Sequence, residues 1–298
     1  MKQRNIIIVC DGDFPTAKQP LKVLREAAII IACDGTVVNL TKHGFTPNYI
    51  VGDMDTLSAA NQKKYKKLIH KNSSQENNDQ TKAFEFALQL IKQEARAATI
   101  ANGAVAKSKA ENTATTKSAR ANSSLQTQYK IIILGATGKR EDHTLGNISL
   151  LADYAEMLKQ SFSAKATAGN KKNTTDKDNP YNITVEIITD YGIFTPYLDS
   201  FKITGRPRGS ASQKKGEQIS FFAFDPTLRI KSKGLVYPLD NVKFDMWWKA
   251  TLNEFAGDGK GRDIAGNRKS RAAANSGKTT AELKFNHPAK VIVFRKHN

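Results

Sequence analysis

The chain has 298 residues, a size that suits one large domain or two modest ones. Hydrophobic residues make up 39% of it, enough for a packed core, and no apolar run approaches the roughly 20 residues that a membrane span requires. The 46 Lys and Arg residues exceed the 28 Asp and Glu residues, which gives a formal net charge of +18. These figures exclude an integral membrane protein and leave nucleic acid open as a partner.

The N-terminus and the cysteines both favour a cytoplasmic protein. Residues 1–4 lead directly into a short strand-like run, without the long apolar segment and the small-residue cleavage site of a secretory signal. Cys10 and Cys33 cannot build a disulfide framework, and each sits in an apolar run. We therefore interpret both as buried thiols in a reducing compartment.

Three segments have a composition unlike the rest of the chain. They cover about residues 94–128, 160–179 and 256–280, and they are rich in Ala, Ser, Thr, Asn, Gly and Lys and nearly free of aromatics. Such segments cannot bury enough apolar surface to offset the cost of ordering, so we expect mobile insertions. An attraction between these basic segments and RNA is an alternative. They lack the aromatic platforms on which bases stack, so we favour solubilising insertions.

Outside these segments, residues 1–200 alternate between short apolar strands and helices. In chain order, strands are expected at residues 5–10, 28–33, 49–51, 130–134 and 183–189, and helices at residues 21–28, 57–70, 79–91 and 144–158. Continuous apolar strands that alternate with helices are typical of a parallel sheet covered on both faces. The sequence therefore predicts an N-terminal α/β domain with a parallel, Rossmann-like sheet.

After about residue 200 the chain becomes rich in short segments of β type. The expected strands are residues 201–204, 218–224, 228–231, 242–249, 283–285 and 290–295. Gly, Pro, Asp and Asn separate them, a pattern that predicts a small antiparallel sandwich or barrel. The adjacent Trp247 and Trp248 would face opposite sides of their strand, so one of them is expected in the β core. We thus expect an α/β domain at residues 1–200 and an all-β domain at residues 201–298.

Acidic residues collect where the strands of the expected α/β domain end. They are Asp11, Asp13, Asp34, Asp53, Asp55 and Asp142, with Arg140 and His143 beside the last of them. Because the carboxyl ends of parallel strands share one edge of a sheet, these carboxylates would repel one another unless a cation bound among them. Carboxylate oxygens without a Cys or His cluster favour Mg²⁺, which commonly bridges carboxylates to substrate phosphates. The residues alone predict a Mg²⁺-dependent enzyme with a phosphate-bearing substrate.

The common phosphate-binding loop motifs do not explain this chemistry. The segment 277–279 ends like a P-loop, but Ala272 stands at the required upstream glycine and no strand precedes it. Residues 135–139 follow a strand, but their glycines are too close together for a phosphate cradle. Turn formation alone explains many Asp-Gly pairs, whereas Asp53 and Asp55, two carboxylates two residues apart, point to a ligand.

Five motifs, in order along the chain, resemble those of the thiamine pyrophosphokinases. They are DG at 34–35 followed by PNYIVGDMDTL at 47–57, QENNDQTKA at 75–83, GATGKREDH at 135–143 with Asn147, GLVYPL at 234–239, and ATLNE at 250–254. The resemblance spans both expected domains and covers essentially the whole chain apart from the three insertions.

The resemblance implies transfer of a pyrophosphoryl group from ATP to the hydroxyl oxygen of thiamine, which gives thiamine diphosphate and AMP. It also implies Mg²⁺ as the cofactor and a homodimer whose active sites are shared between subunits. Thiamine and ATP are then the expected partners, and we expect neither a membrane nor a nucleic acid. Another Mg²⁺-dependent pyrophosphoryl- or nucleotidyl-transferase remains the first alternative, and a basic RNA-binding protein the second.

The resemblance also assigns roles to individual residues. Those expected to act in catalysis are Asp53, Asp55, Asp79, Lys82, Arg140 and Asp142, with Asp53, Asp55 and Asp79 as the Mg²⁺ ligands. Those expected to bind the substrate are Asp34, Gln75, Tyr237, Thr251 and Asn253, with Asp34 at the phosphate edge. Those expected to hold the nucleotide are Asp53, Lys82, Arg140, His143 and Asn147. Tyr237 would stack on thiamine, and Thr251 and Asn253 would line the pocket for its pyrimidine.

The chain departs from the family motifs at a few positions. Lys139 stands where the family usually has a second glycine, which leaves open a changed turn or an added phosphate contact. Ala250 and Leu252 replace two serines and remove hydroxyls that could orient the pyrimidine. Residues 76–78 also differ, so metal ligation by that segment rests on Asp79.

Overall fold

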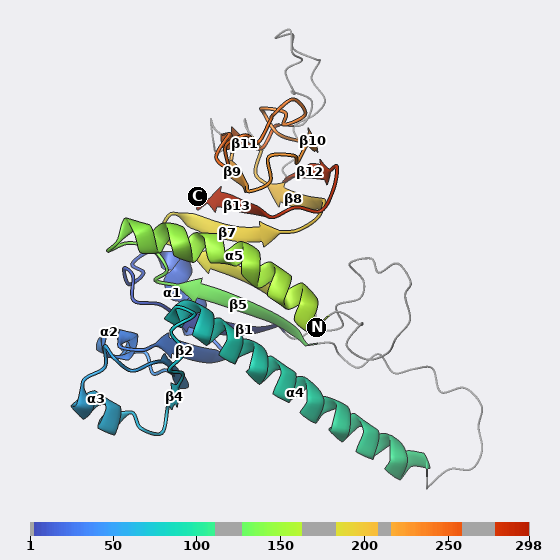
Figure 1. Ribbon diagram of the computed structural model, residues 1–298. Helices are drawn as coiled ribbons and strands as arrows, with labels where there is room; N and C mark the ends of the chain where they lie inside the picture. The colour runs from blue at the N-terminus through green and yellow to red at the C-terminus, as the bar shows by residue number, and fades with distance from the viewer. Residues whose placement is uncertain (1–2, 111–126, 163–182, 208–215, 258–277, 298) are drawn as a thin grey trace. The chain divides into compact units, whose positions relative to one another are not determined.

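The computed structural model describes residues 3–110, 127–162, 183–207, 216–257 and 278–297 (Figure 1). The chain divides into two compact units, the first made of residues 1–14, 21–136 and 159–184 and the second of residues 15–20, 137–158 and 185–298. Most of the three expected insertions lies outside the described residues. The expected domains, 1–200 and 201–298, remain a prediction.

Five parallel strands form the sheet of the first unit. They are β1 (Gln3–Val9), β2 (Ile29–Cys33), β3 (Tyr49–Gly52), β4 (Ile69–Lys71) and β5 (Gln128–Leu134), in the order β5-β1-β2-β3-β4. The central strands read as continuous apolar runs, and Ile7, Ile8, Ile31 and Ile133 have no exposed surface. This confirms the parallel sheet that the alternation of strands and helices predicts.

A helix follows each of the first four strands. These helices are α1 (Lys18–Arg25), α2 (Thr36–Lys42), α3 (Ala59–Lys64) and α4 (Asp79–Ala110). α4 packs on β1, β2 and β3 and buries Ala83, Phe84 and Ala87 (Figure 1). It continues to Ala110, so the beginning of the segment 94–128, expected to be a mobile insertion, is helical. Its high alanine content favours that continuation.

Two expectations for the first unit need correction. The helix expected at residues 57–70 is only half present, because α3 ends at Lys64 and residues 69–71 form β4, where Ile69 is the partner of Ile50 in β3. α2 was not expected, although it follows β2 directly. In both places the contact with the neighbouring strand or sheet outweighs a weak local pattern.

The second unit contains α5 and an antiparallel set of strands. The elements are α5 (Glu141–Phe162), β6 (Ile183–Ile188), β7 (Gly192–Tyr197), β8 (Phe201–Gly205), β9 (Gln218–Ala223), β10 (Ile230–Lys233), β11 (Ala250–Glu254), β12 (Thr279–Phe285) and β13 (Val291–Lys296). One group follows the order β11-β9-β13-β7-β6, and a separate three-stranded sheet follows the order β10-β12-β8. The chain is therefore a mixed α/β protein with a separate antiparallel sheet.

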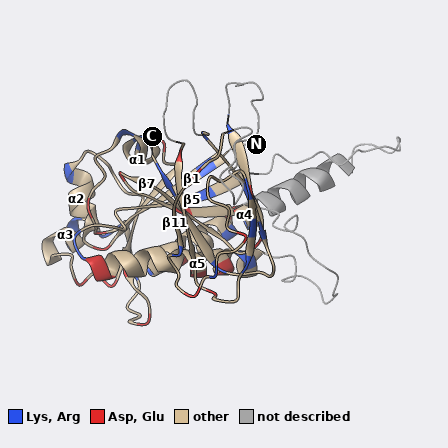
Figure 2. Ribbon diagram, turned by 90° about the horizontal axis from the view of Figure 1, so that it is seen from above, with Lys and Arg blue, Asp and Glu red and all other residues tan. Residues whose placement is uncertain are grey.

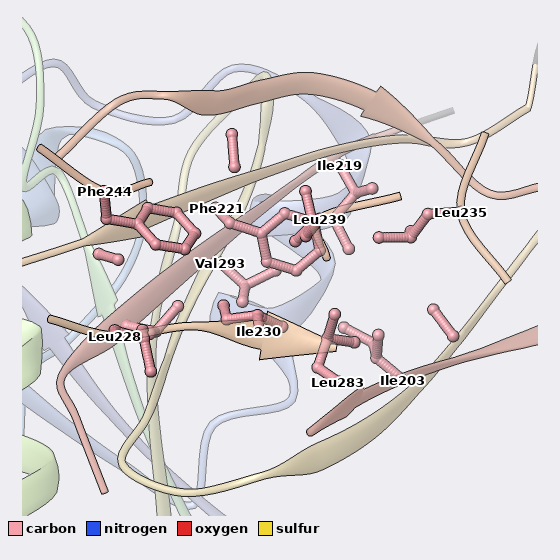
Figure 3. Packing of buried hydrophobic residues seen from close by; sticks show 14 of the residues in the cluster. Ile203, Ile219, Phe221, Leu228, Ile230, Leu235, Leu239, Phe244, Leu283 and Val293 are labelled. Atoms are coloured by element: carbon pink, nitrogen blue, oxygen red, sulfur yellow. The ribbon is translucent and has the colours of Figure 1, made fainter. Parts of the chain in front are cut away.

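The core of the second unit lies between these antiparallel strands (Figure 3). Phe221, Leu239, Phe244 and Val293 are among its buried members. The strand expected at residues 242–249 is wrong, since this stretch is a series of turns.

Because no strand alternation operates in that stretch, neither adjacent tryptophan enters the core. Trp247 and Trp248 are 42% and 47% exposed, and the buried aromatic residue of this stretch is Phe244.

The surface charge is spread over several elements. Figure 2 shows Lys and Arg on α1, α2 and α3, where Lys22, Lys42 and Lys63 stand in or near the last turns. Within the part of the chain that the structure describes, no helix combines the length and the hydropathy needed to cross a membrane.

Candidate active site

Three carboxylates meet at the carboxyl ends of β2 and β3. Asp34 directly follows β2, and Asp53 and Asp55 follow β3. Because Cys33 is the partner of Val51 in the sheet, the two strands end at the same level. One oxygen from each of the three carboxylates lies within 4.8 Å of the others. The sequence-based prediction that acidic side chains converge at this edge is thus confirmed for these residues.

Gly52 allows the loops after β2 and β3 to approach closely. A Cβ atom at this position would lie 2.9 Å from the Cβ of Asp34 and 3.2 Å from Oδ1 of Asp79. The first of these distances is too short for two carbon atoms that are not bonded. A side chain at residue 52 would therefore push Asp34 away from the other carboxylates.

Lys82 lies between two carboxylates of the same unit. Its Nζ donates to Oδ2 of Asp53 at 3.0 Å and to Oδ1 of Asp79 at 3.1 Å, and its side chain is only 2% exposed. The Nε2 of Gln75 donates to Oδ2 of Asp53 at 3.4 Å. Asp79 occupies the first residue of α4, where the positive end of the helix dipole favours a carboxylate.

Charges in this group shift the pKa values in opposite directions. The hydrogen bond from Lys82 lowers the pKa of Asp53. Contact with the Asp34 carboxyl raises the pKa of Asp55, and the charge of Asp53 adds to the effect. Burial raises the pKa of Asp79 in spite of its bond to Lys82. Burial also lowers the pKa of Lys82, but the hydrogen bonds to Asp53 and Asp79 outweigh it and the net shift is upward.

The Asp34 carboxylate is used unevenly. Asp34 is 2% exposed, and its Oδ2 accepts hydrogen bonds from Thr56, whereas its Oδ1 has no hydrogen-bond partner among the residues that the structure describes. A buried acceptor without a partner costs about 1–3 kcal/mol. One oxygen of Asp34, together with one each from Asp53 and Asp55, makes a set of hard donors that fits a cation such as Mg²⁺.

A second group of expected site residues forms the start of α5, in the second unit. Arg140 Nε and Nη2 donate to Oδ1 and Oδ2 of Asp142 at 3.1 and 2.6 Å, a bidentate ion pair. The N–H of His143 donates to Oδ1 of Asp142 at 2.9 Å. The guanidinium lowers the pKa of Asp142, and the carboxylate raises that of Arg140. His143 is exposed and Asn147 is half-buried one turn further along α5.

A third group joins β11 to the segment 234–239. The Asn253 side chain is buried, and its Nδ2 donates to the carbonyl of Tyr237 at 2.7 Å while its Oδ1 accepts from the N–H of Tyr237 at 3.2 Å. This clamp fixes the Tyr237 backbone and leaves its side chain 61% exposed. Thr251 is half-buried on β11. Asn253 therefore positions Tyr237, a role that the motif resemblance did not indicate.

Strained backbone occurs within the motif segments. Among the described residues, the non-glycine residues with positive φ are Asp34 (38°), Met54 (68°), Lys139 (61°) and Leu252 (61°). Such strain persists where the surrounding structure imposes it and is common at functional sites. Lys139 adopts this left-handed conformation although it is not a glycine.

The expected site residues thus fall into three groups. The first brings together Asp34, Asp53, Asp55, Asp79, Lys82 and Gln75; the second Arg140, Asp142, His143 and Asn147; the third Tyr237, Thr251 and Asn253. The close carboxylate set contains Asp34 and does not contain Asp79, which the resemblance implies as a Mg²⁺ ligand. Thr56 is the neighbour that sequence reasoning missed, although a hydroxyl directly after two aspartates was a usable signal.

Comparisons with known proteins decide the family. A family model described as thiamin pyrophosphokinase, catalytic domain, matches residues 21–164, and a second, described as thiamin pyrophosphokinase, substrate-binding domain, matches residues 192–260. The chain belongs to the thiamin pyrophosphokinase family. Its members transfer pyrophosphate from ATP to thiamine, so this chain is a thiamine diphosphokinase, and the alternative of an RNA-binding protein is set aside.

Solved structures show the same fold. The thiamin pyrophosphokinase from Candida albicans is 18% identical with a TM-score of 0.60, over 100% of this chain and 93% of its own. The yeast enzyme is 16% identical with a TM-score of 0.60 over 99% and 86%, and the one from Bacillus subtilis 17% identical with a TM-score of 0.57 over 99% and 100%. No curated protein sequence matched the chain in a direct comparison.

Proposed function

We propose that this thiamin pyrophosphokinase depends on Mg²⁺ and binds it through Asp34, Asp53 and Asp55. The observation that carries the proposal is that Asp34, one of three residues whose carboxylate oxygens lie within 4.8 Å of one another, has a buried Oδ1 without a hydrogen-bond partner among the described residues. Three carboxylates so close together repel one another, and a divalent cation relieves that repulsion. The role of Asp79 as a further ligand, implied by the family resemblance, is part of the proposal.

The chain's own residues would prepare the transfer. Lys82 holds Asp53 in place by its 3.0 Å hydrogen bond and keeps the charge of Asp79 balanced. Bound Mg²⁺ would offset negative charge on the phosphates that the thiamine hydroxyl must approach. Positioning and charge of this kind lower the barrier without a strong general base.

For residues of the second unit, the roles proposed here follow the family resemblance alone. We assign nucleotide contacts to Arg140, His143 and Asn147, with Asp142 orienting the guanidinium through two hydrogen bonds. The exposed ring of Tyr237 offers the thiazolium cation of thiamine an aromatic face, an interaction of roughly 1 kcal/mol or more. Thr251 and Asn253 would line the pocket for the pyrimidine of thiamine.

The family resemblance also supports a proposal for the domains and the oligomeric state. We propose an N-terminal Rossmann-like domain for ATP and Mg²⁺, a C-terminal β-sandwich domain for thiamine, and a homodimer with shared active sites. The two free cysteines, both buried, support a cytoplasmic location.

The test is a coupled assay on purified protein. ATP and thiamine should give AMP and thiamine diphosphate in equal amounts, and chelation of divalent cations should stop the reaction until Mg²⁺ is restored. Formation of ADP, or activity only with another alcohol, would favour the alternative transferase. Activity that persists at full rate without a divalent cation would refute the metal proposal.

A variant pair separates the site from general effects of charge. Asp53→Asn removes one ligand and should reduce turnover by at least about 100-fold while the far-UV circular dichroism is unchanged. The control is Glu26→Gln, which also removes one carboxylate charge from the first unit, at a side chain that is 57% exposed. Normal turnover in Asp53→Asn would contradict the assignment of this residue.

A further inference from the structure

We infer that Thr56 is a positioning residue for Asp34: it occupies one carboxylate oxygen completely and thereby reserves the other for the cation. The inference rests on the proposed Mg²⁺ site. Thr56 is exposed and lies one residue beyond Asp55, and its hydroxyl and its N–H both donate to Oδ2 of Asp34. Its effect on the reaction would pass through Asp34.

Two donors of Thr56 converge on the same atom. The hydroxyl donates to Oδ2 of Asp34 at 2.8 Å, and the backbone N–H donates to the same oxygen at 3.1 Å. Both bonds restrain rotation of the carboxylate about its terminal torsion, which is otherwise broad. With Oδ2 held in this way, Oδ1 is left without a hydrogen-bond partner in the part of the chain that the structure describes, and we infer that it is the oxygen offered to the cation.

The direction of the hydroxyl proton is also fixed. The N–H of Gly35 donates to Oγ1 of Thr56 at 3.1 Å, so this oxygen acts as an acceptor on that side. A hydroxyl has a single proton, and the remaining close acceptor is Oδ2 of Asp34. These three hydrogen bonds connect Asp34 and Gly35, which follow β2, with Thr56 in the loop after β3.

This link supports a backbone conformation that would otherwise relax. Asp34 has a φ of 38°, in the left-handed region that non-glycine residues seldom adopt. Its N–H is held by the carbonyl of Val51 at 2.9 Å, and the Gly35 N–H is held by Thr56. Without the hydroxyl, the carboxylate would turn toward solvent or toward Asp55, and the cation would lose a prearranged ligand.

The experiment measures binding of Mn²⁺, used as a spectroscopic substitute for Mg²⁺, to the full chain without nucleotide. Free Mn²⁺ is followed by electron paramagnetic resonance for the wild type, Thr56→Val and Thr56→Ser. Valine keeps the shape of the side chain and removes the hydroxyl, so the dissociation constant should rise about 10-fold or more. Serine keeps the hydroxyl and should stay within about twofold of the wild type.

The matched control is Thr41→Val in α2. Thr41 also uses its hydroxyl within the first unit, donating to the carbonyl of Val37 at 2.9 Å, and it lies outside the carboxylate group. This variant should bind Mn²⁺ like the wild type. A kinetic comparison completes the design: Thr56→Val should need more Mg²⁺ for half-maximal rate, and Thr56→Ser should not.

Each other outcome overturns the inference. Equal binding by Thr56→Val and the wild type would show that the hydroxyl does not position Asp34, while the proposed metal site would stand. Weak binding by both Thr56 variants, or failure of Thr56→Val to fold, would make the residue structural. No Mn²⁺ binding by the wild type would instead refute the metal site itself.

Discussion

Replacement of Lys82 by Met removes the cation that the structure places between Asp53 and Asp79. Methionine keeps most of the length of the aliphatic stem, so the packing around this 3% exposed residue changes little. What is lost is the pair of hydrogen bonds of 3.0 and 3.1 Å from Nζ. Two carboxylates then face each other without the group that balances them.

The size of the effect follows from the distances and the burial. At 3.0 Å and an effective dielectric constant near 20, one pair of opposite charges attracts by about 5 kcal/mol before desolvation is counted. Removing one partner of a fully buried pair costs about 3–5 kcal/mol. Because the side chains of Asp53 and Asp79 are 16% and 32% exposed, water relieves part of the penalty, and we expect a loss of about 2–3 kcal/mol.

The assay is urea unfolding at pH 7, with and without Mg²⁺. Without the metal, Lys82→Met should unfold at lower urea than the wild type. Added Mg²⁺ should recover part of the loss, because a ligand that binds only the folded state stabilises it and the variant offers more negative charge. The control is Lys22→Met, whose ammonium is 61% exposed and 3.9 Å from Glu26, and which should cost less than about 0.5 kcal/mol.

Two results would refute the conclusion that Lys82 stabilises the protein through its ion pairs. If Lys82→Met were within about 0.5 kcal/mol of the wild type in both conditions, the ion pairs would contribute nothing to stability. The carboxylates would then need no internal counter-charge, and the electrostatic basis of the site would be wrong. A loss of stability that becomes larger when Mg²⁺ is added would also contradict it.

Three further predictions concern the second unit and the loop before α5. Lys139→Gly should stabilise the protein by about 0.5–1 kcal/mol in thermal unfolding, because glycine removes the strain of a φ of 61°; a loss of stability would show that the Lys139 side chain contributes more than its backbone costs. Asp190 accepts hydrogen bonds from the N–H groups of Thr16 and Ala17, and although burial opposes it, the bonds from Thr16 lower its pKa. This contribution is therefore present above the unfolded pKa of about 3.9 and is lost as the pH falls through the lower folded value. Asp190→Asn should cost about 1 kcal/mol at pH 7, and the cost should shrink as the pH falls through the folded pKa, as judged by urea unfolding. A cost that does not change with pH would exclude the carboxylate charge as the cause. Asn253→Asp places an acceptor against the Tyr237 carbonyl, so it should lower the stability by about 1–3 kcal/mol. It should also raise the KM for thiamine more than it lowers kcat. An unchanged KM would show that the hydrogen bonds between Asn253 and Tyr237 do not affect substrate binding.

Hydrophobic pattern predicted the parts of the fold in which a whole strand is buried. The apolar runs before Cys10 and Cys33, and the one ending at Leu134, are strands of one parallel sheet, as expected. Short segments with mixed patterns were predicted less well. Residues 69–71 form a strand and residues 242–249 form turns, because sheet pairing and core packing decided there and neither leaves a periodic signal in so short a stretch.

For the site, the sequence predicted which residues lie together but not how their side chains are oriented. The carboxyl ends of parallel strands lie at one edge of the sheet. The positions of Asp34, Asp53 and Asp55 directly after their strands were therefore enough to predict that the three carboxylates lie close together. Hydrogen bonds that orient a side chain depend on loop torsions and on neighbours from other elements, which spacing does not encode. The sequence therefore did not predict the hydrogen bond from the Thr56 hydroxyl to Asp34. Asn253, which we expect to line the thiamine pocket, also binds the backbone of Tyr237 through its amide. A motif thus identifies which residues gather at a site, and only the hydrogen bonds show which of them act through another.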